Sequence, residues 1–292
     1  MKIIYSPQDV ITELNQTIIG NDKLKKVLGT LGFMYNVKCF AIEAGIQLES
    51  LPRFNMFISG SSGSGKTEGV LQLAKILDVP MHRIDCSTIV AHGWEGTGLD
   101  THLEAFLKKS PSGLGIILFD EIDKKSMTGK YGDYQSYLQD NLLDLLDGAY
   151  SFKKSQTPFT SNIDYNKINN ALIILSGSFE NYRRDNKMIK NLLGFKMDWK
   201  NTLIDLGFKP ELVKRLVTFA ETDEVTEDSL REIFNIKSSV LDKYVNLFYA
   251  HLHDHEFPKE EFIKTLIERD QGFREIDTII FDYLLKHFNR VL

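Results

Sequence analysis

The sequence predicts an α/β fold in which helices flank a parallel β-sheet, followed by a small helical domain. Short apolar runs of strand length alternate with helical patterns up to about residue 220. Several of these runs are unbroken, as is typical of strands that are buried on both faces. Beyond residue 221 every periodic segment is helical, with no strand between the helices. We therefore expect a large domain over residues 1–220 and a small helical domain over residues 221–292.

The individual elements have local signals. Ser6 followed by Pro7 and Asp9 indicates a helix start, because proline fits the first helical position and an acid is favoured in the first turn. A second helix is expected after Asn21, where apolar residues recur at helical spacing. Strands are expected near 54–59, 81–85, 115–120, 171–176 and 216–220, with helices near 66–77, 99–109 and 134–146. The polar stretch 151–170 indicates a long loop or hairpin, and the later helices are expected at 229–234, 240–252, 260–269 and 275–288.

Composition narrows the class of protein. The chain has 292 residues, of which 42% are hydrophobic and 26% charged, enough to bury one substantial core. The net charge is −5 and Lys and Arg form no dense stripe, so no nucleic-acid partner is predicted. No segment approaches transmembrane length and the first residues lack a signal-peptide pattern, so no membrane partner is expected. Cys39 and Cys86 are far apart and indicate reduced thiols in a cytoplasmic protein.

The first motif that carries chemistry is the run Gly60-Ser61-Ser62-Gly63-Ser64-Gly65-Lys66-Thr67, between an expected strand and an expected helix. Glycines at these positions let backbone N–H groups face phosphate oxygens at the positive end of the helix. Lys66 is then expected to reach the β- and γ-phosphates, and the Thr67 hydroxyl to ligate Mg²⁺. This is a Walker A motif, or P-loop, and it predicts that the chain binds ATP.

The second motif is the run 115–121, in which four apolar residues follow Gly115 and the run ends in Asp120 and Glu121. It predicts a buried parallel strand that emerges beside the P-loop. Asp120 is expected to hold the Mg²⁺ shell, while Glu121 is placed to orient and polarise the attacking water. The pair of motifs therefore predicts an ATPase with ATP and Mg²⁺ as its cofactors.

Four segments carry a family resemblance. The run 120–124, Asp-Glu-Ile-Asp-Lys, is similar to the Walker B segment of the AAA+ ATPases of the Clp group. The run 207–216 resembles the segment of that group that ends in the arginine finger, and the run 271–274 resembles its sensor 2 element. Ile18 and Ile19 match a pair that lines the adenine pocket in that group. The chain most resembles the ClpX and HslU protein unfoldases. No counterpart of the zinc-binding N-terminal domain of ClpX is expected in it. The resemblance implies an AAA+ P-loop NTPase fold.

The resemblance also implies roles for individual residues. Arg215 falls at the position of the arginine finger, which stabilises transition-state charge in a neighbouring subunit and so implies a ring, most simply a homo-hexamer. The alternative for Arg215 is a surface ion pair. Arg274 falls at the sensor 2 position, where it would contact the nucleotide, and an exposed helix start is the alternative. Ser176 is the expected sensor 1 residue, as in HslU.

Substrate-handling elements are expected in three places. Trp94, within the run Gly93-Trp94-Glu95-Gly96, lies where the family has an aromatic pore loop and is expected to grip a polypeptide; a buried tryptophan is the alternative. Residues 124–134 are a second candidate pore loop, or an ordinary surface loop. The tripeptide Leu193-Gly194-Phe195 resembles the loop by which ClpX binds a ClpP-type peptidase, although a helix ending at Gly194 is slightly favoured.

The function expected from these features is an ATP-hydrolysing ring that unfolds or remodels protein substrates by threading them through a central pore. A ClpP-type peptidase or an adaptor protein is a candidate partner. The alternative is an ATP-dependent switch that assembles or loads a partner, including on nucleic acid, without threading. Trp94 distinguishes the two, because only a threading protein needs an aromatic grip on its substrate.

Overall fold

The computed structural model describes residues 2–46, 51–89, 98–125, 132–152, 163–180, 182–183, 198–235, 259–269 and 275–288. Their centre is a five-stranded sheet with the strand order β2-β3-β4-β1-β5, in which every neighbouring pair is parallel. The strands are β1 (Asn55–Ser59), β2 (Met81–Asp85), β3 (Ile116–Asp120), β4 (Leu172–Gly177) and β5 (Thr218–Glu221). The expected α/β fold and its five strands are confirmed. Because all strands run the same way, their carboxyl ends meet at one edge of the sheet.

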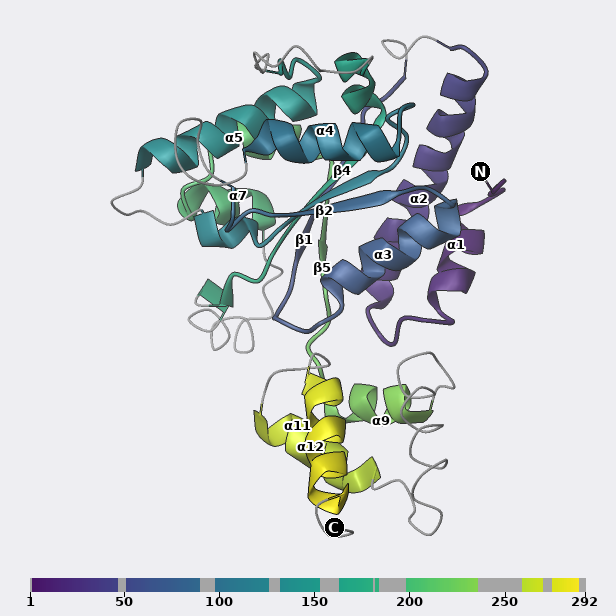
Figure 1. Cartoon of the computed structure of the whole chain (residues 1–292), viewed down its shortest axis with the longest axis vertical. Helices are drawn as coiled ribbons and strands as arrows, with labels where there is room; N and C mark the ends of the chain where they lie inside the picture. The colour runs from purple at the N-terminus through teal and green to yellow at the C-terminus, as the bar shows by residue number, and fades with distance from the viewer. Residues whose placement is uncertain are drawn as a thin grey trace.

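Helices cover both faces of the sheet, as Figure 1 shows. Successive strand residues point to opposite faces, so Met56 and Ile58 pack into one apolar core and Phe57 into the other. The first core contains residues of α1 (Pro7–Leu14), α2 (Asp22–Glu43) and α3 (Lys66–Leu77). The second contains residues of α4 (Leu99–Lys109), α5 (Gly132–Asp147), α7 (Trp199–Asp205) and α8 (Pro210–Arg215). The result is a three-layer arrangement that leaves the carboxyl edge of the sheet open for a ligand.

Tyr35 fixes the opposite edge, where the strands begin. Its side chain is fully buried, and its hydroxyl accepts from the Gly115 N–H at 2.8 Å. The same hydroxyl lies 2.9 Å from the Gly115 carbonyl oxygen and 3.0 Å from that of Asn170, within donating distance of both. Burial raises the pKa of Tyr35 well above its ordinary value, so the phenol keeps its proton for these bonds. One side chain of α2 thus holds the starts of β3 and β4 together.

The C-terminal helices form a separate group. Figure 1 shows the chain leaving β5 and running to α9 (Glu227–Asn235), α11 (Lys259–Arg269) and α12 (Ile276–Phe288), below the sheet in that view. These helices share an apolar core of their own, which includes Leu230, Phe262 and Ile280. The absence of a strand between the described helices agrees with the expectation of a helical region. The boundary at residue 220 stays a prediction, and the helix expected at 240–252 lies outside the described residues.

Two short 3₁₀-helices occupy segments for which loops were expected. η2 (Ile122–Lys125) follows β3, and η3 (Tyr165–Asn170) forms the end of the polar stretch 151–170. The candidate pore loop 124–134 therefore begins in η2 and ends in α5, while its central residues lie outside the described part of the chain.

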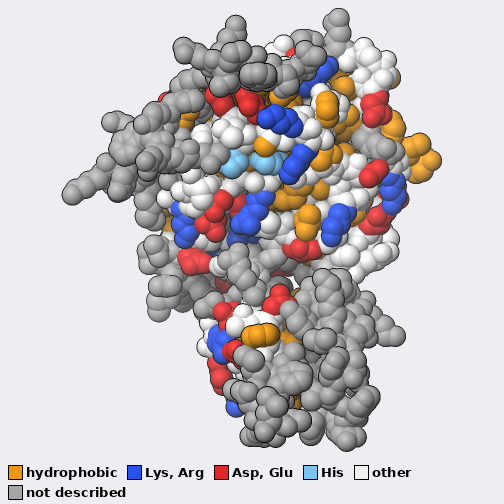
Figure 2. Space-filling model, viewed as in Figure 1, with side chains coloured by type: hydrophobic (Ala, Val, Ile, Leu, Met, Phe, Trp, Pro, Cys, Tyr) orange, Lys and Arg blue, Asp and Glu red, His pale blue; other side chains and the backbone are white. Residues whose placement is uncertain are grey.

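The surface seen in Figure 2 carries both signs of charge. Lys and Arg side chains lie among Asp and Glu side chains on this face, with hydrophobic side chains between them. A basic stripe of the kind that follows a nucleic-acid backbone is therefore not seen on the described part of this face. Among the helices that the structure describes, none is both long enough and apolar enough to span a membrane.

Candidate functional site

The P-loop, residues 60–67, joins the end of β1 to the start of α3. Gly63 has φ 71° and Gly65 has φ 94°, left-handed conformations that favour glycine, and these turn the loop back toward the helix. The Lys66 ammonium donates to the carbonyl oxygens of Gly60, at 2.6 Å, and Ser61, at 2.8 Å. The cation is therefore held inside the loop, where a phosphate group would meet it.

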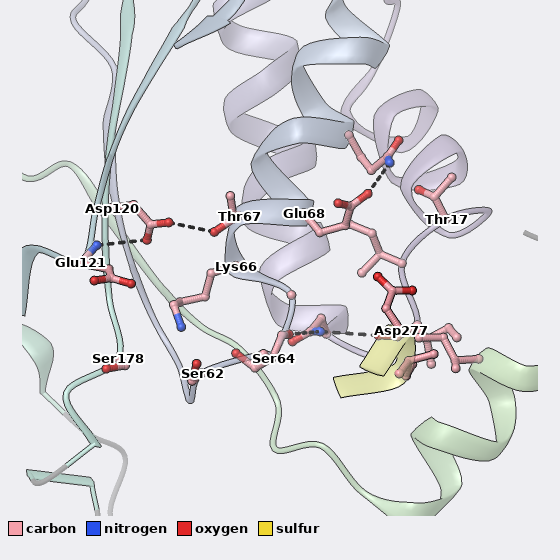
Figure 3. Close-up of a pocket in the computed structure, with 18 of the residues that line it drawn as sticks. Thr17, Ser62, Ser64, Lys66, Thr67, Glu68, Asp120, Glu121, Ser178 and Asp277 are labelled. Atoms are coloured by element: carbon pink, nitrogen blue, oxygen red, sulfur yellow. Dashed lines mark hydrogen bonds between the residues drawn. The ribbon is translucent and has the colours of Figure 1, made fainter. Parts of the chain in front are cut away.

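A pocket of about 680 Å³ opens beside the P-loop, a volume within the range of small-molecule sites. Figure 3 shows Lys66, Thr67, Asp120 and Glu121 on one side of it and Thr17 and Asp277 on the other. The pocket is also lined by residues expected to contact the nucleotide, namely Ile18, Ile19, Ser62, Gly63, Ser64 and Gly65. Gly60 and Ser61 are not among its lining residues, but they accept the Lys66 hydrogen bonds.

Asp120 ends β3, is almost fully buried and lines the pocket. Its Oδ2 accepts from the Thr67 hydroxyl at 3.0 Å and from Arg83 Nε at 2.8 Å, and its Oδ1 accepts from the Ser176 hydroxyl at 2.6 Å. Burial raises the pKa of this carboxyl, but the hydrogen bonds from Ser176 and Thr67 and the Arg83 charge outweigh it. The pKa therefore lies below its ordinary value and Asp120 is ionised at neutral pH.

Thr67 and Asp120 form a donor set that fits Mg²⁺. The two side chains are in hydrogen-bond contact at the mouth of the P-loop, which puts one hydroxyl and one carboxylate side by side. Mg²⁺ is usually held by one or two protein oxygens together with water and substrate phosphates, and a larger protein cage is not needed. Among the described residues, no cluster of three or more His, Cys, Asp or Glu side chains offers a competing metal site.

Glu121 lies directly after β3, at the point where the chain turns sharply. Its φ is 58°, a left-handed value that non-glycine residues seldom adopt, and its side chain lines the pocket. Its backbone N–H donates to Asp120 Oδ1 at 3.1 Å, which fixes the turn. Strained backbone of this kind is found most often at functional sites, where the surrounding structure maintains it.

The end of β4 contributes two serines with different surroundings. Ser176 is fully buried and its hydroxyl is bonded to Asp120, so it does not line the pocket. Ser178 lines the pocket, and its N–H and hydroxyl donate to Asp123 at 3.2 and 2.9 Å. Asp123 also accepts from the N–H of Phe179, which is itself left-handed with φ 51°. The role expected of Ser176 as sensor 1 stays a prediction, and Ser178, for which no role was predicted, is a pocket residue.

Arg215 lies outside the pocket. It ends α8, its side chain is 48% exposed, and its guanidinium forms an ion pair with Asp147 at the end of α5. Asn55 fixes the backbone around it by donating to the Arg215 carbonyl oxygen at 2.8 Å and accepting from the Val217 N–H at 2.7 Å. This position is compatible with the surface ion pair that was the alternative expectation, and an arginine that serves a neighbouring subunit would also be exposed.

Several predicted residues fall outside the part of the chain that the structure describes. These are Trp94, Arg274 and the tripeptide Leu193-Gly194-Phe195. Their expected roles in gripping substrate, sensing nucleotide and binding a peptidase therefore stay predictions.

Three residues of the site had no motif to mark them. Arg83 reaches Asp120 from the edge strand β2, and Asn21 and Thr222 contact the P-loop from distant parts of the sequence. The only local signal was the Gly20-Asn21 pair, a composition that favours left-handed turns. Both residues have φ 56°.

A P-loop between a buried strand and a helix, facing a second strand that ends in Asp-Glu, defines a P-loop NTPase. Residues 56–200 match the family described as "ATPase family associated with various cellular activities (AAA)". This match identifies residues 56–200 as an AAA ATPase domain, and the chain is accordingly an ATPase that binds ATP.

The chain is similar to proteins named "ATP-dependent Clp protease ATP-binding subunit ClpX". Those of Bacteroides thetaiotaomicron and Bacteroides fragilis are both 25% identical to it over 283 residues, covering 85% of this chain and 67% of the relative. The resemblance to the ClpX type of AAA+ ATPase is thereby confirmed.

Proposed function

We propose that the protein is a ring-forming ATPase that uses hydrolysis to unfold or remodel other proteins, threading them through a central pore. The observation that supports this most directly is the convergence of Lys66, Thr67, Asp120 and Glu121 on one pocket, in a chain similar to ClpX. Such a pocket is equipped to hydrolyse ATP, and the similarity favours protein as the material on which the energy is used.

In the proposed mechanism the P-loop amides and Lys66 bind the phosphates of ATP, while Ile18 and Ile19 contact the adenine. Thr67 and Asp120 would hold Mg²⁺, which supplies positive charge to the phosphate oxygens. Ser176 keeps the Asp120 carboxylate oriented through its 2.6 Å hydrogen bond. Glu121 orients and polarises the attacking water from its fixed turn.

Completion of the site by a neighbouring subunit is part of the proposal. Arg215 is exposed and does not line the pocket of its own subunit, so we propose that it reaches the pocket of a neighbour in a homo-hexamer. Arg274 would report the nucleotide state; in the sequence it stands two positions before Ile276, which begins α12 and lines the pocket together with Asp277. A cytoplasmic location is proposed with this function.

Trp94 is the proposed contact with the substrate polypeptide, because a flat aromatic side chain can grip an extended chain without reading its sequence. The alternative function is an ATP-dependent switch that positions a partner, possibly on nucleic acid, without threading. The similarity to ClpX and the mixed charge on the described face in Figure 2 favour threading.

Replacement of Glu121 by Gln tests the hydrolytic assignment. The Glu121→Gln variant should bind ATP as tightly as the parent and lose at least about a hundredfold in turnover, because the phosphate contacts remain and the base is lost. Lys66→Ala should instead weaken nucleotide binding. Normal turnover in Glu121→Gln would contradict the role of Glu121, and normal nucleotide binding in Lys66→Ala would contradict that of the P-loop.

Replacement of Trp94 by Ala separates threading from switching. A threading enzyme with Trp94→Ala should keep its ATPase activity and lose the unfolding of a tagged, stably folded protein, since chemistry and grip lie on different segments. If the variant unfolds the tagged protein as fast as the parent, the threading role of Trp94 is wrong.

Partnership with a peptidase is tested with Phe195→Ala. In the presence of a ClpP-type peptidase and ATP, degradation that is lost in this variant while ATPase activity is kept would support docking through Leu193-Gly194-Phe195. Absence of any association with the parent protein would favour a remodelling enzyme that acts without a peptidase.

A further inference from the structure

Asn21 occupies the N-cap position of α2 but does not cap the helix. It has φ 56°, and its side chain makes no hydrogen bond to the first turn. An asparagine at this position normally accepts from a backbone N–H two or three residues later, a contact that stabilises the start of the helix. Its side chain is nevertheless buried, with a relative exposure of 4%. The amide group is therefore used for another purpose.

That purpose is a bridge between two distant segments. The Asn21 Nδ2 donates to the carbonyl oxygen of Ser64 in the P-loop at 3.2 Å. Its Oδ1 accepts from the N–H of Asp223 at 2.7 Å, in the connector, which we define as residues 222–226 between β5 and α9. One buried amide thus joins the phosphate-binding loop to the chain segment that leads to the C-terminal helices.

Thr222 makes a second link between the same two segments. Its hydroxyl lies 2.7 Å from the Ser64 hydroxyl, and its N–H donates to the Ser59 carbonyl oxygen at 2.9 Å. A Cβ added at Gly60 would lie 1.7 Å from the Thr222 hydroxyl oxygen. The first glycine of the P-loop is therefore required partly because the connector passes directly over it.

We propose that Asn21 and Thr222 are positioning residues that fix the P-loop to the connector, so that nucleotide affinity depends on the position of the C-terminal helices. Ile233 of α9 and Ile276 of α12 line the same pocket. Movement of these helices therefore changes the wall of the pocket and, through the connector, the position of the P-loop. By linkage, nucleotide binding then restrains the connector by the same free energy. The inference depends on nucleotide binding at this pocket and not on the remodelling activity.

Asn21→Gly is a clean test of the first link. Glycine adopts φ 56° without strain, and no helix cap is lost because Asn21 provides none. Thr222→Val removes the second link while keeping the shape of the side chain. With a fluorescent ADP analogue, each variant should bind roughly threefold to tenfold more weakly than the parent, the effect of one or two hydrogen bonds. The double variant should lose less than the product of the single effects, because both links end on Ser64.

Asn36→Ala is the matched control. Asn36 is also a buried asparagine, and it joins α2 to the N-terminal segment. It accepts from the Ile4 N–H at 3.2 Å and donates to the Lys2 carbonyl oxygen at 2.9 Å. Its loss should lower stability and leave ADP affinity within twofold of the parent. Equal weakening of ADP binding in Asn36→Ala and Asn21→Gly would overturn the proposal, because the effect would then be general destabilisation.

Hydrogen exchange gives a second measurement, one that would not change if Asn21 and Thr222 only stabilised the fold. In the parent, ADP should slow amide exchange over the connector as well as over the P-loop. In Asn21→Gly at saturating ADP, protection of the P-loop should persist while the ADP-dependent protection of the connector is reduced. Unchanged ADP affinity with unchanged connector protection in both Asn21→Gly and Thr222→Val would overturn the proposal.

Discussion

The guanidinium of Arg83 is bonded to the carboxylate of Asp120, with Nε 2.8 Å from Oδ2. The arginine is 46% exposed and Asp120 only 6%, so a surface cation reaches inward from the edge strand to a buried anion. The oxygen that it contacts is the one that also accepts from Thr67. Arg83 therefore supplies positive charge at the place where we propose that Mg²⁺ acts.

Removal of this charge should strengthen Mg²⁺ binding. In Arg83→Gln, the Mg²⁺ concentration that half-saturates binding of a fluorescent ADP analogue should fall by about threefold to tenfold, because a nearby positive charge repels the ion even when solvent screens it. Lys2→Gln is the control, since it removes a cation from an exposed pair with Glu13, far along the chain from the site. An unchanged Mg²⁺ requirement in Arg83→Gln would show that the Arg83 charge does not oppose Mg²⁺ binding.

Loss of the Tyr35 hydroxyl should destabilise the fold. Tyr35→Phe leaves the buried Gly115 N–H without its acceptor, which should lower the free energy of unfolding by about 1–3 kcal/mol. Tyr5→Phe is the matched control, because Tyr5 is 82% exposed and its change should have no measurable effect. Urea denaturation of the nucleotide-free protein measures both. Equal stability of the two variants would show that the hydroxyl does not hold the strands together.

Stability should decline in mild acid because of His82 and His102. Their rings lie 5.8 Å apart, and neither Nε2 has a hydrogen-bond partner among the described residues. Burial lowers the pKa of both imidazoles below the ordinary 6.5, and for His82 the charges of His102 and Lys109 add to the effect. The unfolded chain therefore binds more protons than the folded one as pH falls through 6.5, so protonation favours unfolding.

The measurement is the free energy of unfolding between pH 7.5 and about pH 5, a range set by the histidine pKa. Stability should fall with pH in the parent, and the slope should be smaller in His102→Gln, which removes one titrating group and the repulsion on the other. A slope equal to that of the parent would mean that these histidines do not contribute.

The Asp123 carboxylate should support both stability and the pocket wall. Asp123→Ala removes the acceptor of the Ser178 and Phe179 backbone N–H groups and should cost about 2 kcal/mol of unfolding free energy. Because Ser178 lines the pocket, ADP affinity should fall as well. Asp123→Asn retains one acceptor oxygen and should lie between the parent and Asp123→Ala in both measurements. Full stability in Asp123→Ala would exclude this support.

The sheet could be predicted because its signals are local. Apolar runs such as 115–120 and a glycine-rich loop followed by Lys66 carry their structure in neighbouring residues, and each of the five expected strands is present within a few residues of its expected position. The η2 and η3 helices could not be distinguished from loops, because short 3₁₀ turns lack a hydrophobic period.

The contacts around the P-loop could not be predicted in the same way. Asn21 meets residues 43 and 202 positions away, and Thr222 meets Ser64 across 158 positions. Such contacts depend on how helices and strands are placed in space, and no spacing within a single segment encodes them. Arg83 had an ordinary strand position and showed its significance only once β2 was known to pair with β3.

The ion pair between Arg215 and Asp147 has a consequence for how subunits would recognise one another. If Arg215 serves a neighbouring site as proposed, on assembly it exchanges a carboxylate of its own subunit for the phosphate of another. The free energy gained on assembly is then the difference between the interaction of Arg215 with phosphate and its interaction with Asp147. This difference is smaller than the gain for an arginine that was exposed only to water. A contact of this kind adds little to the strength of a ring, but it makes correct alignment depend on whether the neighbour holds a nucleotide.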